Sequence, residues 1–142
     1  MPSVPLFVYG TLRDPDLRRA VLQRLDVPGA VVPATLAGFR AAYLPGRTYP
    51  GLVRSRRHST PGALIFGLTR ADQEALAAYE GPEYCLLRLH ARISGKLIRV
   101  DIYLTWERPS ALAPHWCLVR WRHEHKAKTL ESVLEGTHAP RS

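Results

Sequence analysis

The sequence predicts an α+β fold in which a mostly antiparallel sheet, curled or closed, has helices packed at its edge. Two observations favour this fold class. Strand-like segments outnumber helical ones, and several of them are separated by turns of hairpin length. The chain has 142 residues, of which 46% are hydrophobic and 23% charged, and this composition is ordinary for a globular domain. We therefore expect one domain over residues 1–136 and a flexible tail over residues 137–142.

The N-terminal segment predicts a strand, a turn and a helix in succession. Leu6–Val8 is a short apolar run, and Tyr9-Gly10-Thr11-Leu12 follows it as a turn. Asp14 is a suitable N-cap with Pro15 at the first helical position, and apolar residues then recur at helical spacing. Val27-Pro28-Gly29 ends this helix.

The central part of the chain predicts further strands and a second helix. Apolar segments bounded by glycine and proline indicate strands at Ala30–Leu36, Phe39–Leu44 and Ala63–Leu68. A helix is expected from Arg70 to Glu80, because Thr69 and Asp72 have the spacing of a capping box. Gly81-Pro82 ends that helix.

A β-hairpin and a last helix complete the prediction. Apolar and polar residues alternate through Leu87–Ile93 and again through Ile98–Leu104, with Ser94-Gly95-Lys96 as the turn. The segment from about Trp116 to Glu135 is expected to be helical, since apolar residues gather on one of its sides.

Charge alone does not define a partner for this chain. The formal net charge is +8, and basic residues cluster at Arg54-Ser55-Arg56-Arg57-His58 and over Arg120–Lys128. Such clusters attract nucleic acids or acidic small molecules, or simply keep the surface solvated. Neither cluster has the Gly-rich or paired-aromatic spacing of a nucleic-acid module, so we do not expect a nucleic-acid partner.

Cysteine usage and hydropathy indicate a cytoplasmic protein. No signal peptide is recognisable and no apolar stretch approaches the ~20 residues that span a bilayer, so we expect no membrane partner. Cys85 and Cys117 form no metal or redox motif, which fits a reducing compartment. His123-Glu124-His125 has no standard zinc spacing, and helical residues two apart point to different sides. We therefore expect neither a metal nor a cofactor.

Two short segments have the chemistry of a binding or catalytic site. In the Tyr9–Leu12 turn, successive backbone N–H groups can surround a carboxylate or phosphate, and glycine permits its close approach. Glu80 lies at a helix C-terminus, where the carbonyl dipoles disfavour a negative charge by roughly 0.3–1 kcal/mol. With burial, such repulsion makes a carboxylate a better general base. The alternatives are a turn that needs glycine for its geometry and an exposed glutamate that tolerates a small penalty.

Four motifs follow one another over roughly residues 5–106. They are Tyr9-Gly10-Thr11-Leu12, Tyr49-Pro50-Gly51-Leu52, Tyr79-Glu80-Gly81 with Tyr84, and Tyr103 at the end of a late strand. In this order and spacing they resemble the gamma-glutamylcyclotransferase-like (AIG2-like) family. The resemblance implies a small mixed β-barrel with flanking helices.

The resemblance also implies an enzyme that needs no cofactor and acts on a small molecule carrying a gamma-glutamyl group. The α-amine of that group attacks its own γ-carbonyl, so that 5-oxoproline forms and an amine or amino acid leaves. The family's glutamate falls on Glu80 as general acid and base, and its loop falls on Tyr9–Leu12, whose amides hold the α-carboxylate. Tyr84 and Tyr103 are expected to line the pocket. The alternative is a non-catalytic or repurposed binding protein on the same fold.

Overall fold

The computed structural model describes residues 4–136, and within them five strands form one sheet in the order β2-β3-β1-β5-β4. The strands are β1 (Leu6–Val8), β2 (Val31–Tyr43), β3 (Pro50–Ile65), β4 (Tyr84–Ile93) and β5 (Lys96–Thr105). β1 is parallel to β5, and the other three pairings are antiparallel. The predicted α+β class with a mostly antiparallel sheet is confirmed.

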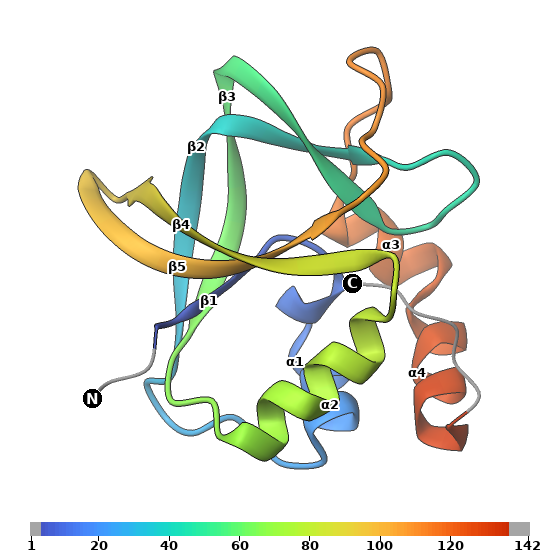
Figure 1. Cartoon of the computed structure of the whole chain (residues 1–142). Coiled ribbons are helices and arrows are strands. Elements are labelled where there is room, and N and C mark those ends of the chain that lie inside the picture. The colour runs from blue at the N-terminus through green and yellow to red at the C-terminus, as the bar shows by residue number, and fades with distance from the viewer. Residues whose placement is uncertain (1–3, 137–142) are drawn as a thin grey trace.

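The sheet is strongly curled, as Figure 1 shows. β2 and β3 are long, with 13 and 16 residues, and their pairing shifts register between Ala37 and Phe39. A bulge of this kind bends a strand and increases its twist. The edge strands β2 and β4 thereby approach each other and share a hydrophobic cluster that contains Leu36 and Ala91. No ladder joins these edges within residues 4–136, so the predicted barrel is a curled sheet with one open side.

Three strand predictions were wrong in their boundaries. The segments expected at Ala30–Leu36 and Phe39–Leu44 form the single strand β2, because the bulge at Gly38 lets the pairing continue. The strand expected at Ala63–Leu68 is the C-terminal end of β3, which begins at Pro50 and ends at Ile65. The middle of β3, from Arg54 to Ser59, is polar and mostly exposed, so its sequence lacks the apolar alternation of a strand.

The helices are α1 (Pro15–Leu22), α2 (Arg70–Glu80), α3 (Leu118–Glu124) and α4 (Lys126–Glu135), and a 3₁₀ turn, η1 (Thr11–Arg13), precedes α1. Both predicted ends of α2 are confirmed. The single helix expected over Trp116–Glu135 is wrong, because the backbone leaves the helical conformation at His125 (φ −132°, ψ −17°). In Figure 1, α1 and α2 lie together below the sheet, and α3 and α4 lie beside them.

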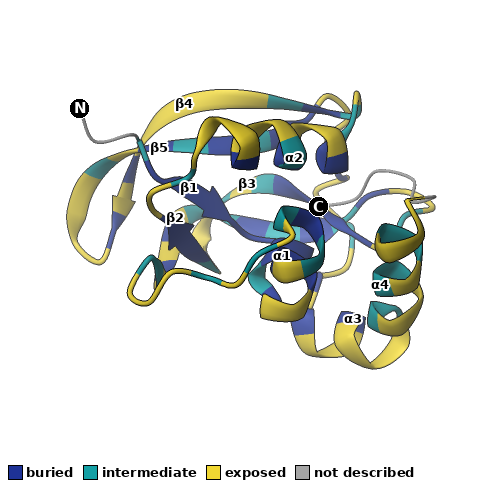
Figure 2. Ribbon diagram, turned by 90° about the horizontal axis from the view of Figure 1, so that it is seen from below, coloured by how far each residue is buried: buried dark blue, intermediate teal, exposed yellow. Residues whose placement is uncertain are grey.

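The core consists mainly of two clusters on the two faces of the sheet. Because strand residues alternate, Leu6 and Val8 face the helices, while Phe7 and Tyr9 face the inside of the curled sheet. β1 is therefore buried on both sides, and the loop that follows it starts from the centre of the molecule. Figure 2 shows this buried centre, and it also shows that β4 is exposed over most of its length.

The predicted flexible tail, residues 137–142, lies outside the described residues. Within residues 4–136, no helix combines the length and the apolar character needed to cross a membrane.

Candidate active site

The loop after β1 begins at the buried residue Tyr9 and continues into η1. Gly10 has φ −114°, so the turn does not require glycine for a left-handed conformation. The first hydrogen bonds of the turn are donated by the N–H groups of Arg13 and Asp14, to Gly10 O (3.1 Å) and Thr11 O (3.0 Å). The N–H groups of Gly10, Thr11 and Leu12 precede these donors and are not used in those bonds.

Glu80 is the last residue of α2, and both ends of this helix are fixed. At the start, Thr69 Oγ1 accepts from Asp72 N (3.1 Å) and Asp72 Oδ2 accepts from Thr69 N (2.9 Å), so the predicted capping box is confirmed. At the end, Gly81 has φ +74° and ψ −171°, a conformation that is essentially restricted to glycine. Glu80 is only 1% exposed, and the exposed-glutamate alternative is therefore wrong.

Glu80 meets the Tyr9–Leu12 loop at a small cavity between α2, β1 and β5. The cavity has a volume of about 10 Å³, which is room for about one water molecule. It is lined by Phe7, Val8, Tyr9, Gly10, Leu12, Glu80 and Tyr103. Among these described lining residues, Glu80 alone has a carboxylate. The structure thus places five predicted site residues around one cavity.

The two tyrosines of this cavity are held as protonated phenols. Tyr9 Oη donates to the backbone oxygen of Tyr103 at 2.6 Å. Burial, and then the negative charge of Glu80, raise the pKa of Tyr9 far above its usual value. The same two causes raise the pKa of Tyr103 to about 12. Near neutral pH both hydroxyls are therefore hydrogen-bond donors rather than bases.

Two predicted site residues lie outside the cavity lining. Thr11 is fully buried, and its Oγ1 is 2.9 Å from the hydroxyl of Tyr79, so it connects the loop to α2 one residue before Glu80. Tyr84 packs against Tyr49 and Tyr103, and its hydroxyl donates to Pro50 O at 3.4 Å. Tyr84 does not line the small cavity, but together with Tyr103 it lines a larger cavity of about 430 Å³.

Arg18 supports the loop and was not anticipated from the sequence. It is 5% exposed, and its Nη1 donates to Leu12 O and Arg13 O, both at 2.9 Å. Its charge is balanced by Asp26 at 2.8 Å. The sequence could have indicated this role, because Arg18 lies on the apolar face of α1, three residues before Val21. An arginine at such a position is buried only when hydrogen-bond or ion-pair partners satisfy its charge.

A second cavity, of about 430 Å³, adjoins the first and shares Tyr103 with it. Ala77, one turn before Glu80 on α2, and Gly81, directly after the helix, line this larger cavity. Tyr103 therefore forms a wall between the Glu80 cavity and a space of a size that holds small ligands.

Metal-binding side chains do not gather in the described part of the chain. Within residues 4–136, no group of three His, Cys, Asp or Glu side chains is placed to hold a metal ion. His123 and His125 lie on either side of Glu124, where α3 ends.

Comparison with known proteins gives consistent matches over most of the chain. A family model described as "Gamma-glutamyl cyclotransferase, AIG2-like" matches residues 6–123. "AIG2-like protein A" of Arabidopsis thaliana is 31% identical over an alignment 137 residues long, which covers 89% of this chain and 77% of that protein.

Solved structures give a similar result. The solution structure of an Arabidopsis thaliana protein that is 29% identical superposes with a TM-score of 0.64, covering 97% of this chain and 95% of that one. A structure named "Gamma-glutamyl cyclotransferase" superposes with a TM-score of 0.57 at 15% identity, covering 98% of this chain and 89% of that one. At such an identity the second likeness shows the fold alone.

Proposed function

The chain belongs to the AIG2-like gamma-glutamyl cyclotransferase family, and from this premise we propose that it converts a small gamma-glutamyl compound into 5-oxoproline. The observation that carries the proposal is the burial of Glu80 beside Tyr9, Gly10 and Tyr103. A carboxylate shielded from water next to the backbone N–H groups of the Tyr9–Leu12 loop is suited to holding a zwitterionic glutamyl head.

The reaction needs positioning more than a nucleophile. Glu80 takes a proton from the α-ammonium group of the substrate, and the freed amine attacks the γ-carbonyl carbon. The new C–N bond closes a five-membered ring, the original amide C–N bond breaks, and Glu80 gives its proton to the departing nitrogen. The attacking nitrogen loses its second proton as the lactam forms, and this proton converts the released amine into an ammonium ion. Holding the two reacting groups together can supply up to ~7–11 kcal/mol, so no covalent enzyme intermediate is required.

The loop and the tyrosines have supporting roles in this reaction. The N–H groups of Gly10, Thr11 and Leu12 bind the α-carboxylate of the substrate, with glycine permitting its close approach. Because the pKa of Tyr103 is raised to about 12, its hydroxyl remains a donor, suited to the γ-carbonyl oxygen as negative charge develops there.

Substrate enters from the larger of the two adjoining cavities. The Glu80 cavity of about 10 Å³ is too small for a glutamyl group, whereas the neighbouring space of about 430 Å³ is not. Tyr103 forms the wall between them, so a change in its side-chain conformation joins the two. Side-chain changes of this kind are common when a ligand binds.

The setting of the reaction is proposed to be the cytoplasm. Cys85 and Cys117 are free cysteines, and free thiols are stable in a reducing compartment.

The experiment compares Glu80→Gln with Glu74→Gln on a panel of gamma-glutamyl compounds, with 5-oxoproline as the readout. Glu74 is on the same helix with a side chain 71% exposed, which makes it a matched control. We expect Glu80→Gln to lower turnover by about 100-fold or more and Glu74→Gln to leave it unchanged.

Full activity of Glu80→Gln would contradict the role of Glu80. A wild-type protein that folds but releases 5-oxoproline from no compound on the panel would instead favour the binding-protein alternative.

A further inference from the structure

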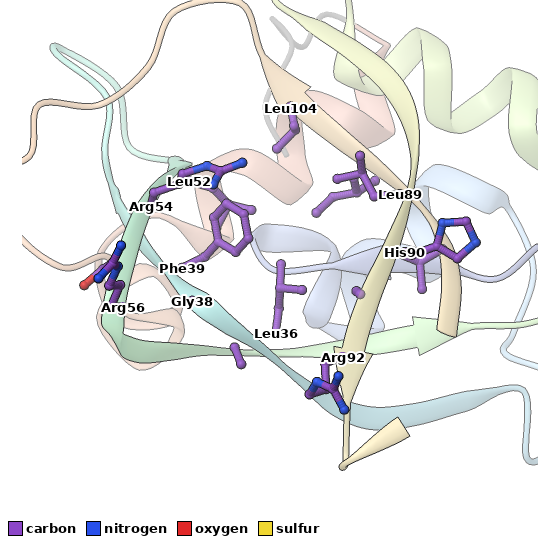
Figure 3. Close-up of a pocket in the computed structure, with 15 residues that line it drawn as sticks. Leu36, Gly38, Phe39, Leu52, Arg54, Arg56, Leu89, His90, Arg92 and Leu104 are labelled. Atoms are coloured by element: carbon purple, nitrogen blue, oxygen red, sulfur yellow. The ribbon is translucent and has the colours of Figure 1, made fainter. Parts of the chain in front are cut away.

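A second site is suggested by a cavity of about 760 Å³ at the open side of the curled sheet, shown in Figure 3. Its volume lies within the range of ligand pockets, ~300–1,000 Å³. Its walls come from β2 and β3, where their pairing shifts register, and from the facing strands β4 and β5. Residues 55–58 of β3 lie opposite the single residue Gly38 of β2, so the register shift between these strands falls at the edge of this cavity.

The floor of the cavity is apolar. Strand residues that point inward from opposite sides of the curl meet there, namely Leu36, Leu52, Leu89, Val100, Ile102 and Leu104. Leu89 is 37% exposed although it faces this interior, so part of the floor remains in contact with water. Covering such a surface with an apolar group is favourable, at roughly 25 cal/mol per Å².

The rim of the cavity is cationic. Arg54 and Arg56 on β3 and Arg92 on β4 line it, and Figure 3 shows them around the apolar floor. Arg54 lies over the ring of Phe39 at 5.9 Å, which holds its guanidinium beside the apolar wall. None of the residues lining the cavity is acidic.

Among the residues that the structure describes, these three arginines have no carboxylate partner, unlike several other arginines. Arg47, Arg88 and Arg122 each form an ion pair at 3.0 Å or less. Within residues 4–136, no ion pair involves an arginine of the rim. Their charges therefore remain available to an external anion, and guanidinium groups match carboxylate, sulfonate and phosphate oxygens.

We propose that this cavity binds a small amphipathic anion, a molecule with an apolar chain or ring system and a terminal carboxylate, sulfonate or phosphate. The apolar body covers the leucine-rich floor, and the anionic end pairs with the arginines of the rim. The net charge of +8 adds a long-range attraction for such molecules.

The test uses two fluorescent probes that share one aromatic body. The first is 1-anilinonaphthalene-8-sulfonate, and the second is N-phenyl-1-naphthylamine, which lacks the sulfonate. We expect the sulfonate probe to bind more tightly than the neutral probe. Added salt should lower the affinity for the sulfonate probe and leave the affinity for the neutral probe unchanged. Equal affinities for the two probes, or no binding of either, would overturn the proposal.

Matched variants locate the site. The affinity for the sulfonate probe should fall by about two- to five-fold in each of Arg54→Gln, Arg56→Gln and Arg92→Gln, since exposed ion pairs contribute up to ~1 kcal/mol. Arg99→Gln is the control, because Arg99 lies on β5 outside the cavity lining. If the three rim variants bind like the Arg99→Gln control, the site is wrongly placed.

The floor is tested in the same way. Leu89→Glu puts a negative charge into the cavity and should abolish binding of the sulfonate probe. Leu97→Glu is the control, because Leu97 is 64% exposed at the tip of the hairpin. A normal melting temperature for both variants shows that the fold is retained. Unchanged binding by Leu89→Glu would contradict an apolar floor.

The ligand could be a separate molecule or the leaving part of a gamma-glutamyl substrate, and turnover distinguishes the two. If the sulfonate probe raises KM in the wild type but not in Arg54→Gln, the cavity takes the leaving part. If the probe binds without changing turnover, the cavity serves a separate ligand. Both outcomes support the site, and the binding measurements stand whether or not the protein forms 5-oxoproline.

Discussion

A contact between two side-chain hydroxyls connects the two halves of the candidate site. Thr11 belongs to the loop that is proposed to bind the substrate carboxylate, and Tyr79 precedes the proposed general base. Their hydroxyl oxygens are 2.9 Å apart, and both residues are buried. A buried hydroxyl that loses its partner is destabilising by about 1–3 kcal/mol, so this contact fixes the loop relative to the end of α2.

We therefore expect Thr11→Val and Tyr79→Phe to be strongly coupled. Each single variant should lower the free energy of unfolding by about 1–2 kcal/mol, because it leaves one buried hydroxyl without this partner. The double variant should lower the free energy of unfolding by less than the sum of the two single variants, and the difference should be about 0.5 kcal/mol or more. Urea denaturation of the four proteins measures this cycle.

A control cycle pairs Thr11→Val with Tyr43→Phe, since Tyr43 is on β2. We expect this second cycle to be additive. Additivity of the Thr11 and Tyr79 substitutions as well would contradict the connecting role of their contact.

At the level of elements, β1 and β3 are packed so closely that one position excludes any side chain. An ideal Cβ at Gly62 would lie 2.3 Å from the backbone oxygen of Val8 and 2.6 Å from a ring carbon of Phe7. The pairing of Val8 with Ala63 brings these strands together directly before the Tyr9–Leu12 loop. Glycine is thus required at position 62 because β1 lies so close to β3. The same close packing fixes the position at which the Tyr9–Leu12 loop begins.

Gly62→Ala should lower the free energy of unfolding by about 1–3 kcal/mol. The added methyl group would have to displace the backbone oxygen of Val8 or the buried ring of Phe7, and both are held in place by strand pairing and core packing. Gly51→Ala serves as the comparison. There the added Cβ would meet side-chain atoms of Pro109 at 2.9 Å, and Pro109 follows the end of β5 in an irregular segment. Denaturation should show a smaller loss for Gly51→Ala, and a larger one would contradict the packing argument.

At the level of the whole molecule, Asp14 joins the N-terminal helix to the C-terminal ones. Its Oδ1 accepts from Leu17 N at 3.0 Å, and its Oδ2 accepts from Arg122 at 2.7 Å and Lys126 at 3.0 Å. Burial by itself would raise the pKa of Asp14, but the hydrogen bonds from Arg122, Lys126 and Leu17 outweigh it. The pKa of Asp14 is consequently below its usual value in the folded protein.

This shift predicts a loss of stability in acid. A carboxyl whose pKa is lower in the folded than in the unfolded state stabilises the fold above its unfolded pKa, and this contribution disappears as the pH falls through the folded pKa. The free energy of unfolding should thus decrease as the pH falls below about 4. Asp72, whose pKa is lowered by its hydrogen bonds with Arg24, acts in the same direction despite its burial.

Asp14→Asn should make the stability less dependent on pH over this range while lowering it at neutral pH. Thermal unfolding at a series of pH values measures both effects. An equal acid dependence in Asp14→Asn and the wild type would show that Asp14 does not contribute.

The sequence by itself determined the elements whose signals are local. The capping box at Thr69 and Asp72, the N-cap at Asp14 and the hairpin turn at Ser94-Gly95 all act within a few residues, and each is where the sequence predicts it. Motif order was also sufficient to identify the family. Glu80 is proposed as the general base on the same grounds, because its position before Gly81 can be read from the sequence.

Tertiary structure decided what depends on residues far apart in the chain. The polar part of β3 forms a strand only because β2 pairs with it. Arg18 is buried only because the loop carbonyls and Asp26 accept its hydrogen bonds. The arginine-rimmed cavity exists because the curl brings β3 opposite β4. Burial and pairing arise from contacts between distant segments, and local patterns of charge and hydrophobicity do not contain that information.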